Sequence, residues 1–227
     1  MKKIIITICC LLGFGTISAQ RLGMLGGIQM TNTWALAGKC EFNPHLGMGF
    51  TTGAIFDYNF SQRFGFEAGL LYNMRRTTFD IDYNHAETTV HFRRTHFYLD
   101  IPLHLYVDFP MKKNVIWAFF AGPSVNVALH GKDIAWENTP QQKPVAMDNE
   151  NIFGNDKRTY RLQIAAGIGT AIKYTHFEWR LGYNVSLNNM TVKEFLWFSG
   201  MTYAQNKYLR DGNLTFSFAY LFDLKRK

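Results

Sequence analysis

The sequence has few cysteines, few prolines and few charged residues for its length. Of its 227 residues, three are cysteine, six are proline and 18% are charged. Cys9 and Cys10 lie in an apolar N-terminal stretch, and removal of that stretch leaves Cys40 without a partner for a disulfide. A lone cysteine is also no zinc-binding motif. The low charge, together with 16% aromatic residues, excludes a disordered chain.

The N-terminal residues have the layout of a secretory signal peptide. Two lysines precede an apolar run over residues 4–14, and small residues lead up to Ala19. This run is too short to cross a membrane as a helix, which takes about 20 residues. We therefore predict that a signal peptide, residues 1–19, is cleaved between Ala19 and Gln20, and that residues 20–227 form one exported domain.

No long apolar run follows this stretch, so the rest of the chain offers no spanning helix. Instead, apolar and polar residues alternate along this part of the chain. In residues 97–109, FYLDIPLHLYVDF, every second residue from Phe97 to Val107 is apolar, whereas Asp100 and His104 share the other parity. Residues 177–188 alternate in the same way. A period of two indicates a strand with one apolar and one polar face.

Eight segments show this alternation fully or nearly so, and the connections between them alternate in length. The predicted strands cover residues 22–33, 46–60, 64–76, 97–109, 115–130, 161–174, 177–188 and 213–223. The short connections are 61–63, 110–114 and 175–176, and the long ones are 35–45, 77–94, 131–160 and 191–212. This pattern predicts an all-β fold, an eight-stranded antiparallel up-and-down barrel with every long loop at one end.

Two kinds of barrel fit eight alternating strands, and they differ in which face points outward. A soluble lipocalin-like binder would hold its apolar face inside, and a transmembrane barrel would expose it to lipid. The apolar face carries Phe50, Phe56, Tyr58, Phe60, Phe64, Phe66, Tyr72, Trp117, Phe119, Trp179, Tyr183, Phe216, Phe218, Tyr220 and Phe222. Because this bulk exceeds the lumen of an eight-stranded barrel, we predict an outer membrane barrel with both termini periplasmic.

Charged and polar side chains of the other parity then point into the barrel. The predicted interior polar cluster consists of Asp57, Glu67, Arg75, Asp100, His104, Asp108, Arg161, Lys173, Glu178 and Arg180. Buried charges need partners, so we expect ion pairs that fill a narrow lumen. The alternative interpretation is a path for protons or ions.

Two arginines of the lipid-facing parity flank the second long loop. Arg76 ends the predicted strand before this loop and Arg93 begins the strand after it, so the two should meet at the outer rim. Arginine binds phosphate with two hydrogen bonds, which predicts contacts with lipopolysaccharide. Simple snorkelling of interfacial cations is the alternative. Removal of Lys2 and Lys3 with the signal peptide lowers the net charge from +7 to +5 (22 basic minus 17 acidic residues). For such an exported chain, anionic lipid is also a more fitting partner than nucleic acid.

Four strands resemble a known family. The segments YLDIPLHLYV (98–107), WAFFAGPSVNVAL (117–129), AAGIGTAIKY (165–174) and WRLGYNVSL (179–187) resemble successive strands of the PorT-like outer membrane β-barrel proteins. Asp100 replaces the commoner Glu of that family, and the tail departs from the usual aromatic ending. The resemblance implies an integral outer membrane protein without enzymatic activity. One family member is implicated in secretion, a role that the resemblance does not carry over.

The remaining functional expectations concern the long loops. We expect loops 131–160 and 191–212 to bind an envelope or secretion-machinery protein or a surface glycan. A transport component and a lipid-modifying enzyme are the alternatives. Catalysis would need a nucleophile beside a loop histidine such as His85, and no such motif occurs. We expect no cofactor and no metal, since His96 and His104 share a face but lie about 27 Å apart along a strand.

Overall fold

The fold is described by a computed structural model. It covers residues 20–36, 40–83, 89–137, 145–147, 152–154, 159–190, 197–198, 201–202 and 208–224. The predicted signal peptide and Ala19 lie outside these residues, and Gln20 is the first residue of the first strand. No helix in the described part of the chain is long and apolar enough to cross a membrane.

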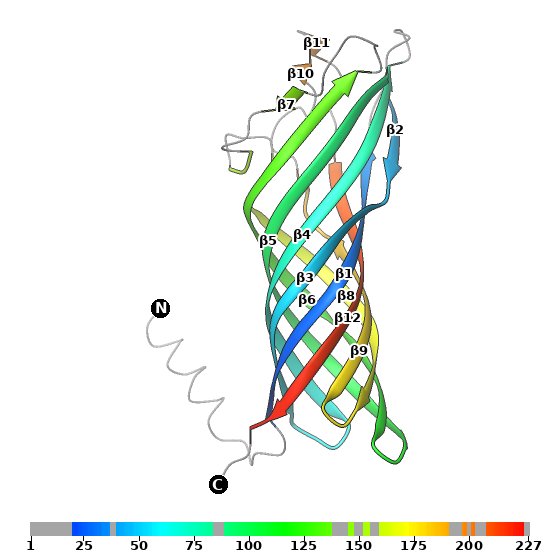
Figure 1. The fold of residues 1–227 in the computed structure, drawn as a ribbon, viewed down its shortest axis with the longest axis vertical. Helices are drawn as coiled ribbons and strands as arrows, with labels where there is room; N and C mark the ends of the chain where they lie inside the picture. The colour runs from blue at the N-terminus through cyan, green and yellow to red at the C-terminus, as the bar shows by residue number, and fades with distance from the viewer. Residues whose placement is uncertain are drawn as a thin grey trace.

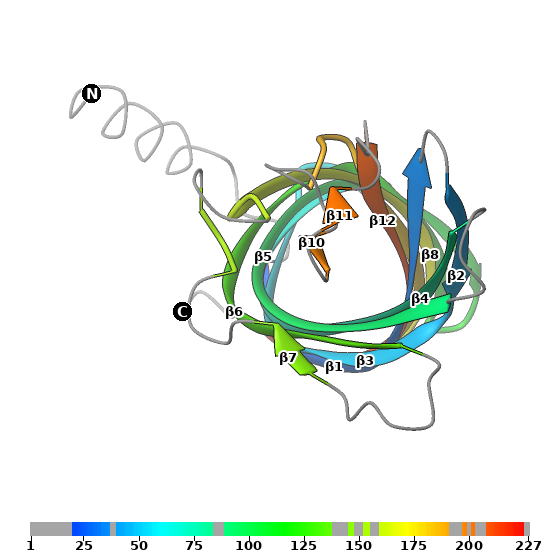
Figure 2. The same cartoon turned by 90° about the horizontal axis from the view of Figure 1, so that it is seen from above.

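Eight antiparallel strands form a closed ring (Figures 1 and 2). In ring order these are β1 (Gln20–Leu36), β3 (Gly47–Asn59), β4 (Phe64–Tyr83), β5 (Thr89–Lys112), β6 (Val115–Glu137), β8 (Leu162–Tyr174), β9 (Phe177–Ser186) and β12 (Tyr208–Asp223). Each strand pairs with its neighbour along the ring, and β12 pairs with β1. The predicted eight-stranded up-and-down barrel is confirmed.

Four shorter strands accompany the ring. They are β2 (Cys40–His45), β7 (Val145–Met147), β10 (Trp197–Phe198) and β11 (Met201–Thr202). The first two extend the ring sheet, because β2 pairs with β4 and β7 pairs with β6. The last two form a separate hairpin, which lies at the end opposite the short turns and within the outline of the ring (Figure 2).

The short connections are tight turns, and the long ones differ from the prediction. Residues 60–63, 113–114 and 175–176 join strands at one end, and Asn114 and Thr175 adopt positive φ there. Much of the predicted loop 77–94 is strand instead, since β4 runs to Tyr83 and β5 begins at Thr89. Above the band of apolar outward-facing residues, both faces of these strands carry polar residues. The alternation of apolar and polar residues is therefore lost there, although hydrogen bonds between neighbouring strands continue.

The same correction applies to the other three predicted loops, and it makes the barrel wall uneven in height. Most of 35–45 is β2, β6 continues to Glu137 and β12 starts at Tyr208. By contrast, β8 and β9 stop at Leu162 and Ser186. On the high side, β2, residues 77–83 of β4, 89–96 of β5, 130–137 of β6 and β7 form what we call the upper sheet (Figure 1).

The apolar face of the ring is outside and the polar face is inside. Along β5, Leu103 and Leu105 are exposed by 50% and 67%, whereas His104 and Tyr106, which alternate with them, are exposed by 6% and 5%. The predicted aromatic face lies on the same outer surface. The lipocalin-like arrangement, with its apolar residues inside, is therefore not the arrangement of this chain.

Close strand approach at a glycine supplies a test of the fold. We expect Gly49→Ala to destabilise the barrel by about 1–3 kcal/mol, because the added methyl would lie 1.8 Å from the carbonyl oxygen of Met74 and push β3 from β4. Gly26→Ala in β1 is the control, since nothing lies within 4 Å of its added methyl. Urea unfolding in lipid vesicles measures both, and equal unfolding free energies would contradict the register.

Candidate functional site

The centre of the barrel holds a cluster of buried charges around Glu67. Arg180 donates hydrogen bonds to both carboxylate oxygens of Glu67, and the distance from Nη2 to Oε1 is 2.7 Å. The Nδ1 atom of His104 lies 3.3 Å from the same Oε1 atom. Glu178 Oε1 lies 3.5 Å from Arg180 Nε, so one guanidinium contacts two carboxylates, one from β4 and one from β9.

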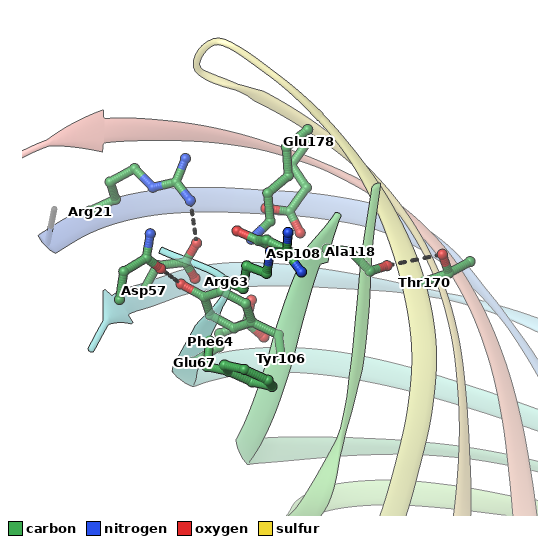
Figure 3. A network of polar contacts seen from close by, with 12 residues as sticks. Arg21, Asp57, Arg63, Phe64, Glu67, Tyr106, Asp108, Ala118, Thr170 and Glu178 are labelled. Atoms are coloured by element: carbon green, nitrogen blue, oxygen red, sulfur yellow. Dashed lines mark hydrogen bonds and ion pairs between the residues drawn. The ribbon is translucent and has the colours of Figure 1, made fainter. Parts of the chain in front are cut away.

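Two further ion pairs occupy the turn end of the lumen, and the one between Arg21 and Asp57 can be followed in Figure 3. Lys173 donates a hydrogen bond of 3.0 Å to Asp108, and its Nζ atom also lies 3.9 Å from the centre of the Tyr106 ring. Arg21 donates a hydrogen bond of 3.3 Å to Asp57. Within the lumen, the contact of Lys173 with Asp108 joins β8 to β5, the two strands that flank β6. The contact of Arg21 with Asp57 joins β1 to β3.

Toward the other end, Arg75 of β4 contacts three residues on two other strands, β5 and β8. It donates a hydrogen bond of 2.5 Å to Asp100 and one of 3.2 Å to Gln163. Its guanidinium carbon lies 4.4 Å from the centre of the Tyr98 ring. Between this level and Glu67, the cavity has a volume of only about 70 Å³. That volume suits a few water molecules, so side chains fill the lumen.

One residue of the predicted interior cluster does not lie inside. Arg161 is exposed, whereas the structure places the other nine on the inner face. Arg161 precedes β8, where the ladder between β6 and β8 has already ended at the pair Val127 and Leu162. Its carbonyl oxygen accepts a 2.8 Å hydrogen bond from the amide of Ala128. Parity alone could not reveal that the wall stops one residue short of it.

Sequence reasoning missed a second buried cluster above Arg75. His96 Nε2 lies 2.7 Å from Asp133 Oδ1, and Arg94 donates a hydrogen bond of 2.8 Å to the Thr159 hydroxyl. The ring of Phe153 covers His96 at a centroid distance of 4.9 Å. Arg94, Asp133, Phe153 and Thr159 fell within the predicted loops 77–94 and 131–160. His96 was placed on the same face as His104 but was considered only as a metal ligand, and continuing that inward parity to Arg94 could have revealed the cluster.

Arg76 and Arg93 both lie exposed on the outer face of the upper wall. They do not stand at strand ends as predicted, because both strands continue for several residues beyond them. Their pairing partners are Thr95 and Thr78, so the two arginines are diagonal neighbours on β4 and β5. The guanidinium carbon of Arg93 lies 5.4 Å from the centre of the Trp136 ring.

An outer-face carboxylate lies above these arginines, beyond the apolar band. Asp80 shares hydrogen bonds with His45 at 2.9 Å and with His91 at 2.6 Å. Partial burial disfavours the charged carboxylate, but the hydrogen bonds from the two histidines outweigh this effect and lower the pKa of Asp80. The ring of His91 stacks on Trp136 at 5.5 Å. Asp80 therefore organises a hydrogen-bonded strip across β2, β4 and β5.

The described residues hold no group of three or more His, Cys, Asp or Glu that could bind a metal ion. His85 and most residues of the predicted binding loops 131–160 and 191–212 lie outside the described residues. His45 and His91 fall within the predicted loops 35–45 and 77–94, and in the described structure both bind Asp80.

Residues 19–192 match the family model described as outer membrane protein beta-barrel domain. The chain belongs to this family. It is accordingly an integral β-barrel of the outer membrane, as its exposed apolar face and closed ring require. The narrower likeness to PorT-like proteins stays a prediction. A search of curated proteins gave no match.

Several solved outer membrane barrels are similar to this chain. Ail of Yersinia pestis is 11% identical, with a TM-score of 0.40 over 90% of this chain and 100% of that one. OprG from Pseudomonas aeruginosa is 10% identical, with a TM-score of 0.45 over 92% and 98%. Neisserial surface protein A is 12% identical, with a TM-score of 0.37 over 88% and 97%. Likenesses at this level carry no argument about function.

The central ion pair supplies a test of the interior. We expect Arg180→Met to cost about 3–5 kcal/mol of unfolding free energy, because it leaves Glu67 buried without its main partner. The double variant Glu67→Gln with Arg180→Met should cost less than the single one. Arg161→Met, an equal change at an exposed site, should cost within about 0.5 kcal/mol. Denaturant titration in vesicles measures all three, and a double variant less stable than Arg180→Met would contradict the pairing.

Proposed function

We propose that this chain is a non-conducting outer membrane barrel that acts through its surface rather than through its lumen. The supporting observation is the filled interior, where paired charges at three levels leave a cavity of about 70 Å³. A conducting pore of small size would need a continuous aqueous path. The alternative, a transport or secretion component like the PorT-like barrels it resembles, would have to use the barrel as a scaffold.

The orientation in the membrane is part of this proposal. The amide of Leu224 donates a hydrogen bond of 2.9 Å to the carbonyl of Gln20, so both ends of the described chain meet. Leu221 is likewise bonded to His176 in a short turn, which puts both ends on the turn side. Outer membrane barrels have short turns toward the periplasm. The upper sheet then projects from the cell surface.

The projecting upper sheet is the proposed binding surface. Its outer face combines Trp136 and His91, whose rings stack, with the exposed Arg93. Aromatic residues and arginine are enriched where proteins bind one another, and both also suit carbohydrate and its charged groups. We propose a surface glycan or an envelope protein as the partner of this sheet and of the loops above it.

We propose no enzymatic activity. The described histidines that could serve as bases are engaged elsewhere: His104 with Glu67, and His96 with Asp133 beneath Phe153. A lipid-modifying reaction would need such a group at the outer rim, facing lipid. His45 and His91 do face outward, but both share one carboxylate. The lipid-modifying enzyme remains the less favoured alternative.

Conductance tests the proposed function. We expect the purified barrel in a planar lipid bilayer to conduct no more than the bare lipid. The positive control is a variant with Arg75, Phe120 and Arg180 replaced by Ala, which removes three large side chains that line the cavity. Its boiling-dependent gel mobility should first show that it folds. Wild-type conductance equal to that of this widened variant would contradict the proposal and favour transport.

A further inference from the structure

The outer surface of β4, β5 and β6 can be followed row by row from the sheet register. In one row Arg76 pairs with Thr95, and Thr95 pairs with Lys132. In the row above, Arg93 lies on the central strand between Thr78 and Ile134. Arg76, Arg93 and Lys132 are all exposed. The three cations therefore form a triangle around Thr95.

Lys132 joins this triangle because of a β-bulge. Below it, residues of even number on β6, such as Ala128, point into the barrel. The register then shifts, since Tyr98 pairs with Ala128 but Phe97 pairs with His130, so that Leu129 is an extra residue. Above the bulge the odd-numbered Asp133 is buried and Lys132 faces outward. Bulges often re-aim side chains near functional sites.

The triangle is small enough for one anion. Neighbouring strands lie about 4.8 Å apart, so the Cα atoms of Arg76 and Lys132 are separated by about 10 Å. Arg93 lies two residues, or about 7 Å, along the middle strand from Thr95. Three long cationic side chains rooted this closely can converge on a single phosphate group.

The cations of the triangle also lack competing acids. No ion pair joins Arg76, Arg93 or Lys132 to a carboxylate of the described residues, and the near acid on this face, Asp80, is engaged by two histidines. The ring of Trp136 packs against one side of the Arg93 guanidinium. The site therefore carries net positive charge that an external anion can neutralise.

The depth of the triangle identifies the anion. Directly below it lies the row of Met74, Phe97 and His130, in which the Phe97 and His130 rings stack at 4.3 Å. Tyr72 stacks on Phe97 at 5.8 Å, and the outward residues from there to the short turns are mainly apolar. Such an aromatic girdle marks the membrane interface, where lipid phosphates lie.

We propose that Arg76, Arg93 and Lys132 form a binding site for a phosphate group of an anionic glycolipid in the outer leaflet. The site rests on the outer membrane orientation proposed above, and it adds a specific third ligand, Lys132, to the two arginines predicted from the sequence. The bound lipid would anchor the base of the upper sheet at a fixed height above the membrane.

Binding of defined lipids tests the site. The probes are diphosphorylated lipid A and its dephosphorylated form, and native mass spectrometry of the mature barrel in detergent measures their dissociation constants. Replacing Arg76, Arg93 and Lys132 by Gln should weaken binding of the diphosphorylated lipid by about tenfold or more per charge removed. Binding of the dephosphorylated lipid should not change.

The matched control removes three exposed cations elsewhere, by Arg63→Gln, Lys113→Gln and Arg161→Gln. It should change affinity by less than about twofold, the effect expected of distant, screened charges. Lys132→Gln alone, at an exposed position, keeps the test decisive if the triple variant fails to fold. Boiling-dependent gel mobility monitors folding throughout.

Three results would overturn the site: equal losses in the triple and control variants, equal binding of the two lipid forms, or displacement of lipid A by millimolar inorganic phosphate, which would indicate a site for free anions. If the protein is still a folded barrel that requires detergent, each of these results overturns the lipid site without contradicting the proposed function. A protein that stays soluble without detergent would instead overturn the outer membrane placement itself.

Discussion

The constraint on which the structure depends is the pairing of backbone polar groups in lipid. An unpaired N–H or C=O group in hydrocarbon costs several kcal/mol, so a sheet that crosses a membrane must close on itself. Here closure is made by β1 and β12, whose ladder runs from Arg21 and Asp223 to Leu36 and Tyr208. Once the ring closes, one face of every strand meets lipid and the other meets a narrow lumen, and the two-residue alternation follows.

The narrow lumen explains the charges that first stand out in the sequence. An eight-stranded ring has an interior only wide enough for side chains, so its filling must pack and must also satisfy its own polar groups. Arg180, Arg75 and Lys173 each reach carboxylates on other strands, which ties the wall together across the interior. Removing one partner of such a pair is costly, although the pairs themselves need add little net stability. The surface of the barrel is then left to carry function.

Much of this arrangement could be predicted from alternation, and its limits are equally physical. In 97–109 the pattern gave both the strand and the direction of Asp100, His104 and Asp108, because lipid and lumen impose opposite chemistry on the two faces. Above the apolar band water meets the outer face, so the pattern fades and residues 77–83 were expected to be loop. The direction of the Arg161 side chain depends on where the ladder between β6 and β8 ends, and that of Lys132 depends on the bulge at Leu129. Strand pairing determines both features, and the alternation within a single strand does not reveal them.

The central claim is that the apolar face meets lipid, and single cysteines along β5 test it most directly. In a Cys40→Ser background, cysteines at 103, 104, 105 and 106 would each carry a fluorophore in barrels reconstituted with brominated lipid. The account predicts strong quenching at 103 and 105 and weak quenching at 104 and 106, with Leu105 and Tyr106 differing most in exposure, at 67% and 5%. Quenching in the opposite phase, or equal quenching at all four positions, would contradict it.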